Sequence, residues 1–335
     1  MTIKDIARES GYAVSTVSRA LNNHPDVSTQ TKEKINAIVA AHQFVPNSNA
    51  RQLKQQNSKS IAIIVKGSLN AFFAGIIEQM ENWIAQTEYG VQVHYVEEDA
   101  DELLAAEHLC RELKPLGILF LGGNIATFQK RFSAIELPCV IATTTSPELR
   151  FENLSCVGID DKAAGKRAMD FLLHKGHQKI GILGGKRENS YISQLRFEGC
   201  LDAVAEAGGA FDESYYQTCN FNYGSAYRGA KKLLERKRDI TAVFAMSDVM
   251  AVGAMRAIFE AGYRCPEDIS VVGFDGIELG KYMVPSLTTV RQPGEEIAKQ
   301  SVALLLSHIE RHTPAKTVLL EDALIEGESV LAINR

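Results

Sequence analysis

Hydrophobic and polar positions divide the chain into two stretches with different periodicities. In residues 1–45 apolar side chains recur at helical spacing and fall on three short faces. These positions are Ile3, Ile6, Ala7, Val17, Ala20, Leu21, Ile35, Ile38 and Val39. Gly11 separates the first two helices, a polar loop over residues 22–26 follows the second, and Ser28 caps a third that ends before Pro46. The pattern predicts an all-α segment of three helices.

From Ser60 onward, short apolar runs rich in β-branched residues alternate with amphipathic helical stretches. The predicted strands cover residues 61–65, 91–96, 117–121, 139–142, 156–159, 179–183, 215–219, 242–246 and 270–274. The predicted helices cover residues 72–87, 161–174, 223–236, 247–261 and 295–311. Apolar strands separated by helices indicate parallel sheets covered on both faces. So many strands exceed one sheet, and a break near residue 160 predicts two doubly wound α/β lobes, with ligands expected beyond the carboxyl ends of the strands.

Composition agrees with a folded protein of several domains. The chain has 335 residues, of which 45% are hydrophobic and 23% charged, and this excludes disordered and fibrous classes. No apolar run approaches the roughly 18 residues of a membrane span. The six cysteines form no CxxC pair and no signal peptide is visible, so we expect reduced thiols and a cytoplasmic location.

The net charge of −5 is unevenly distributed along the chain. Residues 1–59 hold eight Lys and Arg against four Asp and Glu, a charge of +4, which leaves −9 for the remainder. A basic segment on an acidic body indicates that the N-terminus meets a polyanion. Chance clustering of solvated charge is the alternative.

Helix, glycine turn and helix form the helix-turn-helix arrangement, whose second helix enters the major groove of DNA. Residues at the start of that helix can reach base edges, and they are Val14, Ser15, Thr16 and, one turn on, Arg19. Small polar side chains suited to phosphates are Ser18, Asn22, Ser28 and Thr31. A three-helix cap without a nucleic-acid role remains the alternative on spacing alone.

An ordered set of motifs runs through the whole chain. They are Thr2-Ile3-Lys4-Asp5-Ile6-Ala7, Ser15-Thr16-Val17-Ser18-Arg19-Ala20-Leu21-Asn22, Val45-Pro46-Asn47, Phe72-Phe73, Val157-Gly158-Ile159-Asp160, Arg196-Phe197-Glu198-Gly199, Ser247-Asp248, Val272-Gly273-Phe274-Asp275 and Leu287-Thr288-Thr289-Val290-Arg291-Gln292. In this order they resemble the lactose-repressor/galactose-repressor (LacI/GalR) family of bacterial transcription regulators. One departure is Ala13, where the family usually has a Ser that can cap the recognition helix and contact a phosphate.

The resemblance implies three domains: a helix-turn-helix headpiece over 1–45, a hinge helix and linker over 46–59, and an effector-binding body over 60–335. In the body it implies an N-lobe of 60–159 with 291–320 and a C-lobe of 160–290 with 321–335. The hinge is expected to order when two chains pair on DNA, with Leu53 inserted into the minor groove to bend the duplex. Further DNA contacts implied are Thr2, Asn47, Ala50 and Arg51. A floppy linker with Leu53 resting on the body is the alternative.

The body resembles periplasmic sugar-binding proteins, which implies a cleft between the lobes for a small polar ligand. The effector-binding residues carried over by position are Phe72, Asp160, Arg196, Phe221, Ser247, Asp248, Asp275 and Gln292. Among these, Asp275 is expected to accept bonds from ligand hydroxyls, Arg196 to donate, and Phe221 to stack on a ring. Alternatives stay open: a strand-end Asp such as Asp160 or Asp248 often caps the next helix, and Phe221 can be core. Ser190 and Ile192 stand where some related repressors have Arg and Thr, which argues against a purine ligand.

The function implied is a cytoplasmic, homodimeric regulator, a repressor of a carbohydrate-utilisation operon. It is expected to bind a near-palindromic operator under control of a sugar or sugar derivative, with no membrane, cofactor, metal or catalytic residue. The sequence holds no Walker loop, HExxH, GxSxG or zinc spacing. Three alternatives remain: a solute-binding protein, a metabolic enzyme fused to a DNA-binding domain, and a catabolite-control regulator that responds to a partner protein.

Overall fold

The computed structural model describes residues 3–21, 26–42, 59–67, 70–98 and 100–333. The chain folds as two compact units, Met1–Ser58 and Lys59–Arg335. The first unit contains the segment predicted as the headpiece, and the second contains the segment predicted as the body.

The headpiece is a bundle of three helices, α1 (Ile3–Ser10), α2 (Val14–Leu21) and α3 (Thr29–Ala41). Gly11 takes a φ of +76° between α1 and α2, a left-handed conformation that glycine adopts without a Cβ clash. The core is centred on Ile6, Val17 and Ile35, one fully buried side chain from each helix, with further apolar side chains packed around them. Burying one face of each short helix holds together elements too short to be stable alone.

The N-lobe of the body is a six-stranded parallel sheet in the order β11-β5-β4-β3-β1-β2. Its strands are β1 (Ser60–Lys66), β2 (Gly90–Val96), β3 (Gly117–Leu121), β4 (Cys139–Ala142), β5 (Leu154–Gly158) and β11 (Thr317–Leu319). Its helices are α5 (Ala71–Ile84), α6 (Glu102–Glu112), α7 (Ile125–Arg131) and α13 (Gly294–Arg311), with a 3-10 turn, η1, over Phe132–Ala134.

The C-lobe repeats this plan in the order β12-β10-β9-β8-β6-β7, in which only β12 runs antiparallel to its neighbour. Its strands are β6 (Ile180–Gly184), β7 (Tyr216–Thr218), β8 (Ala242–Ala245), β9 (Ser270–Asp275), β10 (Thr288–Arg291) and β12 (Ala323–Ile325). Its helices are α8 (Asp161–His174), α9 (Tyr191–Glu206), α10 (Tyr223–Arg236), α11 (Asp248–Glu260) and α12 (Leu279–Tyr282), with a 3-10 turn, η2, over Glu213–Tyr215.

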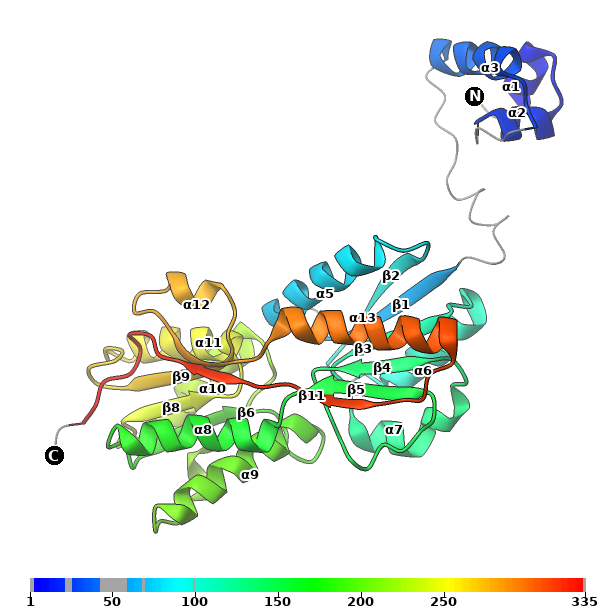
Figure 1. Ribbon diagram of the computed structural model, residues 1–335. Helices are drawn as coiled ribbons and strands as arrows, with labels where there is room; N and C mark the ends of the chain where they lie inside the picture. The colour runs from blue at the N-terminus through cyan, green and yellow to red at the C-terminus, as the bar shows by residue number, and fades with distance from the viewer. Residues whose placement is uncertain (1–2, 22–25, 43–58, 68–69, 99, 334–335) are drawn as a thin grey trace. The chain divides into compact units, whose positions relative to one another are not determined.

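The chain passes between the lobes in three places: from β5 to α8, from β10 to α13, and from β11 to β12 (Figure 1). Each lobe is therefore assembled from segments distant in sequence. The predicted fold class, a helical headpiece with two doubly wound lobes, is confirmed. The short strands β10, β11 and β12 were not among the predicted elements. No described helix is long and apolar enough to cross a membrane.

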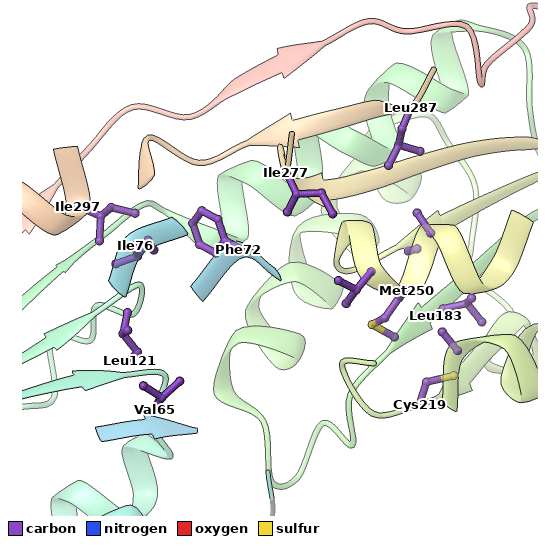
Figure 2. Close-up of a cluster of buried hydrophobic side chains, with 14 of the residues drawn as sticks. Val65, Phe72, Ile76, Leu121, Leu183, Cys219, Met250, Ile277, Leu287 and Ile297 are labelled. Carbon is purple, nitrogen blue, oxygen red and sulfur yellow. The ribbon is translucent and has the colours of Figure 1, made fainter. Parts of the chain in front are cut away.

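Apolar packing continues from one lobe to the other. Phe72 and Ile76 of α5 and Ile297 of α13 share one buried cluster with Ile277 and Leu287 of the C-lobe (Figure 2). Phe72 and Ile297 lie in the first turns of α5 and α13, so the contact between the lobes involves the amino ends of these two helices. The carboxyl ends of the strands of both sheets lie beside this contact. That is the edge at which doubly wound folds bind ligands.

Candidate functional site

One face of α2 is exposed, on the side of the helix that points away from the headpiece core. Val17 and Ala20 are buried, whereas Val14 is 41% exposed and Ser15 and Arg19 are also exposed. Thr16 and Ser18 are half-buried at the edges of this surface. The helix thus separates a packing face from a face that a DNA major groove can receive.

The amino end of α3 is held by a side-chain cap. The Ser28 hydroxyl accepts a bond from the Thr31 amide at 3.3 Å and lies 2.9 Å from the Thr31 hydroxyl. Both hydroxyls stand at a helix start, a place that favours phosphate. The other predicted DNA contacts, Thr2, Asn22, Asn47, Ala50, Arg51 and Leu53, lie outside the described residues, as does the predicted hinge helix.

Ala13 occupies the capping position of α2. Its carbonyl accepts bonds from the Thr16 and Val17 amides at 2.9 and 3.0 Å, but its methyl group can accept none. The helix therefore starts without the side-chain cap that a Ser supplies, worth about 1 kcal/mol.

In the body, a cavity of about 550 Å³ lies between the two lobes, at the carboxyl ends of their strands. Of the eight predicted effector residues it brings together five: Phe72, Arg196, Phe221, Asp275 and Gln292. Further lining side chains from the N-lobe include Lys66, Asn70, Phe73, Glu98, Asn124 and Thr144, and from the C-lobe Lys186, Ser190, Tyr191 and Asn220.

Arg196 is only 2% exposed and is held by three different groups. Its Nε and Nη2 both lie 2.8 Å from Asp161 Oδ1, its Nη1 donates to the Met246 carbonyl at 2.6 Å, and its guanidinium stacks on Phe274 at 3.6 Å. A guanidinium has five N–H donors, so two of them are left for a ligand.

Two glycines explain how this arginine reaches its place. A Cβ at Gly165 of α8 would lie 2.3 Å from the Arg196 carbonyl oxygen, and one at Gly199 of α9 would lie 2.0 Å from the Lys162 carbonyl oxygen. The two helices therefore pack with their backbones in contact. That approach puts Arg196 of α9 beside Asp161 at the start of α8. Burial raises the pKa of Asp161, and the neighbouring guanidinium opposes that shift.

Asp275 ends strand β9 and is 3% exposed. Its Oδ1 accepts a bond from Gln292 Nε2 at 2.8 Å. Its Oδ2 and the Gln292 Oε1 are buried with no hydrogen-bond partner among the described residues. Burial raises the pKa of Asp275 to about 8, while Arg196 and the Gln292 bond act in the opposite direction. In the ionised form of Asp275, these oxygens are two adjacent buried acceptors without donors, which a ligand that carries hydroxyl donors would satisfy.

Aromatic side chains form the walls around these polar groups. Phe72 packs beside Phe73 with ring centroids 6.2 Å apart, and Tyr191 and Phe221 contribute from the C-lobe. Phe221 also packs against the buried apolar clusters, so it is both part of the cavity wall and, as the alternative proposed, part of the core. Aromatic walls with a few convergent polar groups are typical of small-ligand sites.

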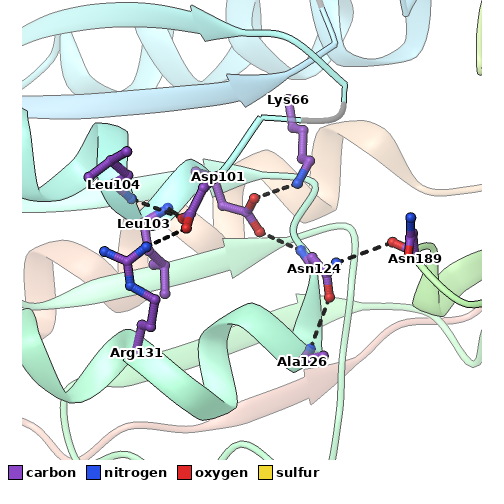
Figure 3. A network of polar contacts seen from close by, with 9 residues as sticks. Lys66, Asp101, Leu103, Leu104, Asn124, Ala126, Arg131 and Asn189 are labelled. Atoms are coloured by element: carbon purple, nitrogen blue, oxygen red, sulfur yellow. Dashed lines mark hydrogen bonds and ion pairs between the residues drawn. The ribbon is translucent and has the colours of Figure 1, made fainter.

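A polar network of the N-lobe borders the cavity and reaches the other lobe (Figure 3). The buried Glu102 pairs with Lys66 and accepts a bond from the Asn124 amide. The Asn124 side chain caps α7 and donates to the Asn189 carbonyl of the C-lobe at 3.3 Å. A second link between the lobes is the bond from the Phe221 amide to Glu98 at 3.2 Å. The lobes are thus in polar contact across the mouth of the cavity.

Three predicted effector residues do not line the cavity, and each has another role. Asp160 is exposed and caps α8 by accepting from the Ala163 amide at 3.0 Å, as the alternative had it. Ser247 caps α11 through the Met250 amide at 3.3 Å. Asp248 is fully buried and bonded to the backbone that follows Asp275, and burial raises its pKa to about 7.

Sequence reasoning missed Asp161, Lys66 and Asn124. Asp161 stands next to the predicted Asp160, and the sequence gives no signal for which of two adjacent acids faces inward. Lys66 ends an apolar strand, which is a visible signal for a side chain at the cleft. Among the described residues, no group of three or more His, Cys, Asp or Glu is placed to hold a metal ion.

Both parts of the chain are similar to known proteins. Residues 2–47 match the family model for bacterial regulatory proteins of the lacI family, and residues 169–330 match a periplasmic binding protein-like domain. The HTH-type transcriptional regulator MalR of Clostridium butyricum is 37% identical over 339 residues, covering 99% of this chain and 100% of that protein.

Two solved structures are similar along nearly the whole chain. The transcriptional regulator CelR in complex with cellobiose superposes with a TM-score of 0.71 at 25% identity, covering 98% of this chain and 99% of the other. The lac repressor dimer bound to operator and the anti-inducer ONPF superposes with a TM-score of 0.73 at 25% identity, covering 99% of each chain.

Proposed function

Because the chain belongs to the LacI family of bacterial DNA-binding transcriptional regulators, we propose that a neutral sugar held between its lobes controls its affinity for operator DNA. The observation that carries the ligand assignment is the pair of buried acceptors, Asp275 Oδ2 and Gln292 Oε1, at the cavity. Adjacent hydroxyls of a sugar supply the donors that these two oxygens lack.

The charges around the cavity favour a neutral ligand over a phosphorylated or acidic one. The two least exposed cations at the site are each paired with a carboxylate, Lys66 with Glu102 and Arg196 with Asp161. Asp275 and Glu98 add acceptors on the cavity wall, and the remaining lysine there, Lys186, is exposed. Lys66 and Arg196 are both paired, so among the described residues that line the cavity only the exposed Lys186 is left to offset the charge of an anionic ligand.

The size of the cavity and its aromatic walls favour a disaccharide. About 550 Å³ lies in the middle of the range for small-molecule sites. Phe72 on one lobe and Phe221 on the other provide two separate apolar surfaces for the C–H faces of two sugar rings. The similarity to a regulator solved with cellobiose supports the same class.

We further propose a homodimer in which each headpiece reads one half of a near-palindromic operator. The similarity to the lac repressor dimer on its operator supports this arrangement. The assignment of residues 1–45, 46–59 and 60–335 as headpiece, hinge and body is part of this proposal, as is a cytoplasmic location.

The cavity acts as a binding site and not as an active site. The bound sugar favours one arrangement of the two lobes over another, and the hinge couples that arrangement to DNA binding by the headpiece. The coupling free energy between the two binding events is about 1–3 kcal/mol. An enzyme would convert the bound sugar, whereas this site returns it unchanged.

The test is a thermal-shift panel on the full-length protein with maltose, cellobiose, lactose, sucrose and trehalose. Ribose, glucose 6-phosphate and glucuronate serve as comparison ligands. A ligand present at 100 times its Kd stabilises the folded state by about 2.7 kcal/mol, which is easily measured. We expect one neutral disaccharide to give the largest shift and to be recovered unchanged.

A shift with the phosphorylated or acidic sugar alone would overturn the neutral-ligand assignment. Asp275→Asn is the matched variant, because it keeps the side chain's size and removes the acceptor charge. A sugar shift that survives fully in this variant would place the ligand elsewhere.

A further inference from the structure

The backbone at the end of β9 adopts a conformation that its sequence does not favour. Asp275 has a φ of +107° and Gly276 a φ of +77°. Glycine adopts such values freely, but a residue with a Cβ does so only where its surroundings hold it. The turn over residues 275–277 therefore needs a clamp, and it is this turn that determines the direction of the Asp275 side chain.

The clamp is the carboxylate of Asp248, the first residue of α11. Its Oδ2 accepts bonds from the Gly276 and Ile277 amides, both at 2.7 Å, and its Oδ1 accepts from the Thr289 hydroxyl at 2.7 Å. Asp248 is 0% exposed, so these bonds are shielded from water. The two amides belong to the residues that directly follow Asp275.

The neighbouring strands are shaped to admit this carboxylate. A Cβ at Gly273 in β9 would lie 2.1 Å from Asp248 Oδ1, so only glycine leaves room for it. A Cβ at Gly276 would lie 2.4 Å from Cγ of Arg291, which excludes a side chain on the turn as well. On the far side of the turn, the Asp275 carbonyl accepts from the Gln292 amide at 3.1 Å.

We propose that Asp248 is a positioning residue of the effector site, whose carboxylate holds the 275–277 turn so that Asp275 Oδ2 faces the cavity. The inference rests on the proposed function, because it assigns the turn a role in binding the sugar. Asp248 does not line the cavity and acts only through the backbone of its neighbours. The turn needs an oxygen at this position that accepts hydrogen bonds from the Gly276 and Ile277 amides.

Two substitutions separate this role from a general structural one. Asp248→Ala removes both acceptors. Asp248→Asn keeps one oxygen for the two amides and turns its NH₂ toward the Thr289 oxygen, which can accept. Ser329→Ala is the matched control, because Ser329 is equally buried in the same lobe and its hydroxyl likewise bonds to the backbone, donating to the Val271 carbonyl at 2.6 Å and accepting from the Thr288 amide at 2.8 Å.

The experiment measures amide hydrogen exchange in the unliganded full-length protein and the affinity for the disaccharide with the largest thermal shift in the panel above. In Asp248→Ala we expect faster exchange at Gly276 and Ile277 and at least tenfold weaker sugar binding. Asp248→Asn restores both to within about threefold of the original protein. Ser329→Ala speeds exchange around its own partners and leaves the affinity unchanged.

Unchanged exchange at residues 276 and 277 in Asp248→Ala overturns the proposal, and so does a uniform rise across the C-lobe with equal affinity loss in Ser329→Ala. If Asp248→Ala does not fold, Thr289→Val carries the test. Removal of its hydroxyl loosens the carboxylate, so exchange at the same two amides must rise and affinity must fall several-fold. If no sugar binds the original protein, the proposed function fails, whereas the exchange measurement still decides whether Asp248 holds the turn.

Discussion

Asp275→Asn makes opposite changes to binding and to stability, and both follow from the position of this carboxyl group. The group lies 3% exposed at the cavity, with one oxygen bonded to Gln292 and the other without a partner among the described residues. A ligand hydroxyl that donates to a carboxylate contributes about 1.5–3 kcal/mol. At about pH 8, where this carboxyl group ionises, loss of the charge therefore weakens sugar binding roughly 10- to 150-fold.

The same substitution stabilises the unliganded protein. Burial raises the pKa of Asp275 to about 8 from its ordinary value of 3.8, so the folded chain binds this proton more tightly than the unfolded chain. A group of this kind lowers the free energy of unfolding as pH rises through the window from about 4 to about 8. Asparagine does not titrate, so the variant escapes this loss at pH 7 and gains about 1 kcal/mol or more.

Two assays test this pair of effects: isothermal titration with the sugar, and chemical unfolding without it, each from pH 5 to 8. In the original protein sugar affinity rises with pH, by at most about tenfold per pH unit, because the hydroxyl donors favour the ionised carboxylate. In Asp275→Asn this group no longer titrates, so it adds nothing to the pH dependence of sugar affinity or to that of the free energy of unfolding. A variant that loses affinity and stability together, or that keeps full affinity, would refute the reasoning.

Three further predictions concern the N-lobe network, the predicted hinge and the headpiece. Lys66→Met leaves the Glu102 charge buried without its partner and lowers the free energy of unfolding by about 3–5 kcal/mol, whereas the double variant with Glu102→Gln recovers most of that loss in denaturant titrations. Leu53→Ala is expected to weaken binding to a specific operator while barely changing binding to random DNA; equal losses in both filter-binding assays count against a wedge in the minor groove. Ala13→Ser supplies the missing cap of α2, and we expect about 1 kcal/mol more headpiece stability and tighter DNA binding, with no change in either as the contrary result.

The sequence was sufficient to predict the architecture, because the lobes are built from long apolar runs and strongly periodic helices. Strand β1 is one continuous buried run, and the helices α8 and α10 begin and end at the predicted residues. The strands β10, β11 and β12 have only three or four residues, too few for a periodic signal, and they pair with strands distant in the sequence.

Site residues that follow a strand were predictable from the sequence. Site residues on helices were not, because the direction of their side chains depends on how the helices pack. Asp275 and Gln292 follow buried strands and meet at the cavity. Asp160 and Asp161 are adjacent at the start of α8, and only the packing of α8 on α9 decides that the second one meets Arg196. The role of Asp248 depends on a left-handed turn whose backbone conformation no local pattern predicts.

In the proposed function, sugar binding in the body changes sequence-specific DNA binding by the headpiece. We would select sites from random duplex DNA with the full-length protein at physiological salt, once with and once without the disaccharide, and then titrate the operator under the same two conditions. We predict a near-palindromic site of about 14–20 base pairs and a change in operator affinity of about 5- to 150-fold when the sugar binds. Recovery of no enriched sequence under either condition, or an operator affinity that is the same with and without bound sugar, would contradict the account.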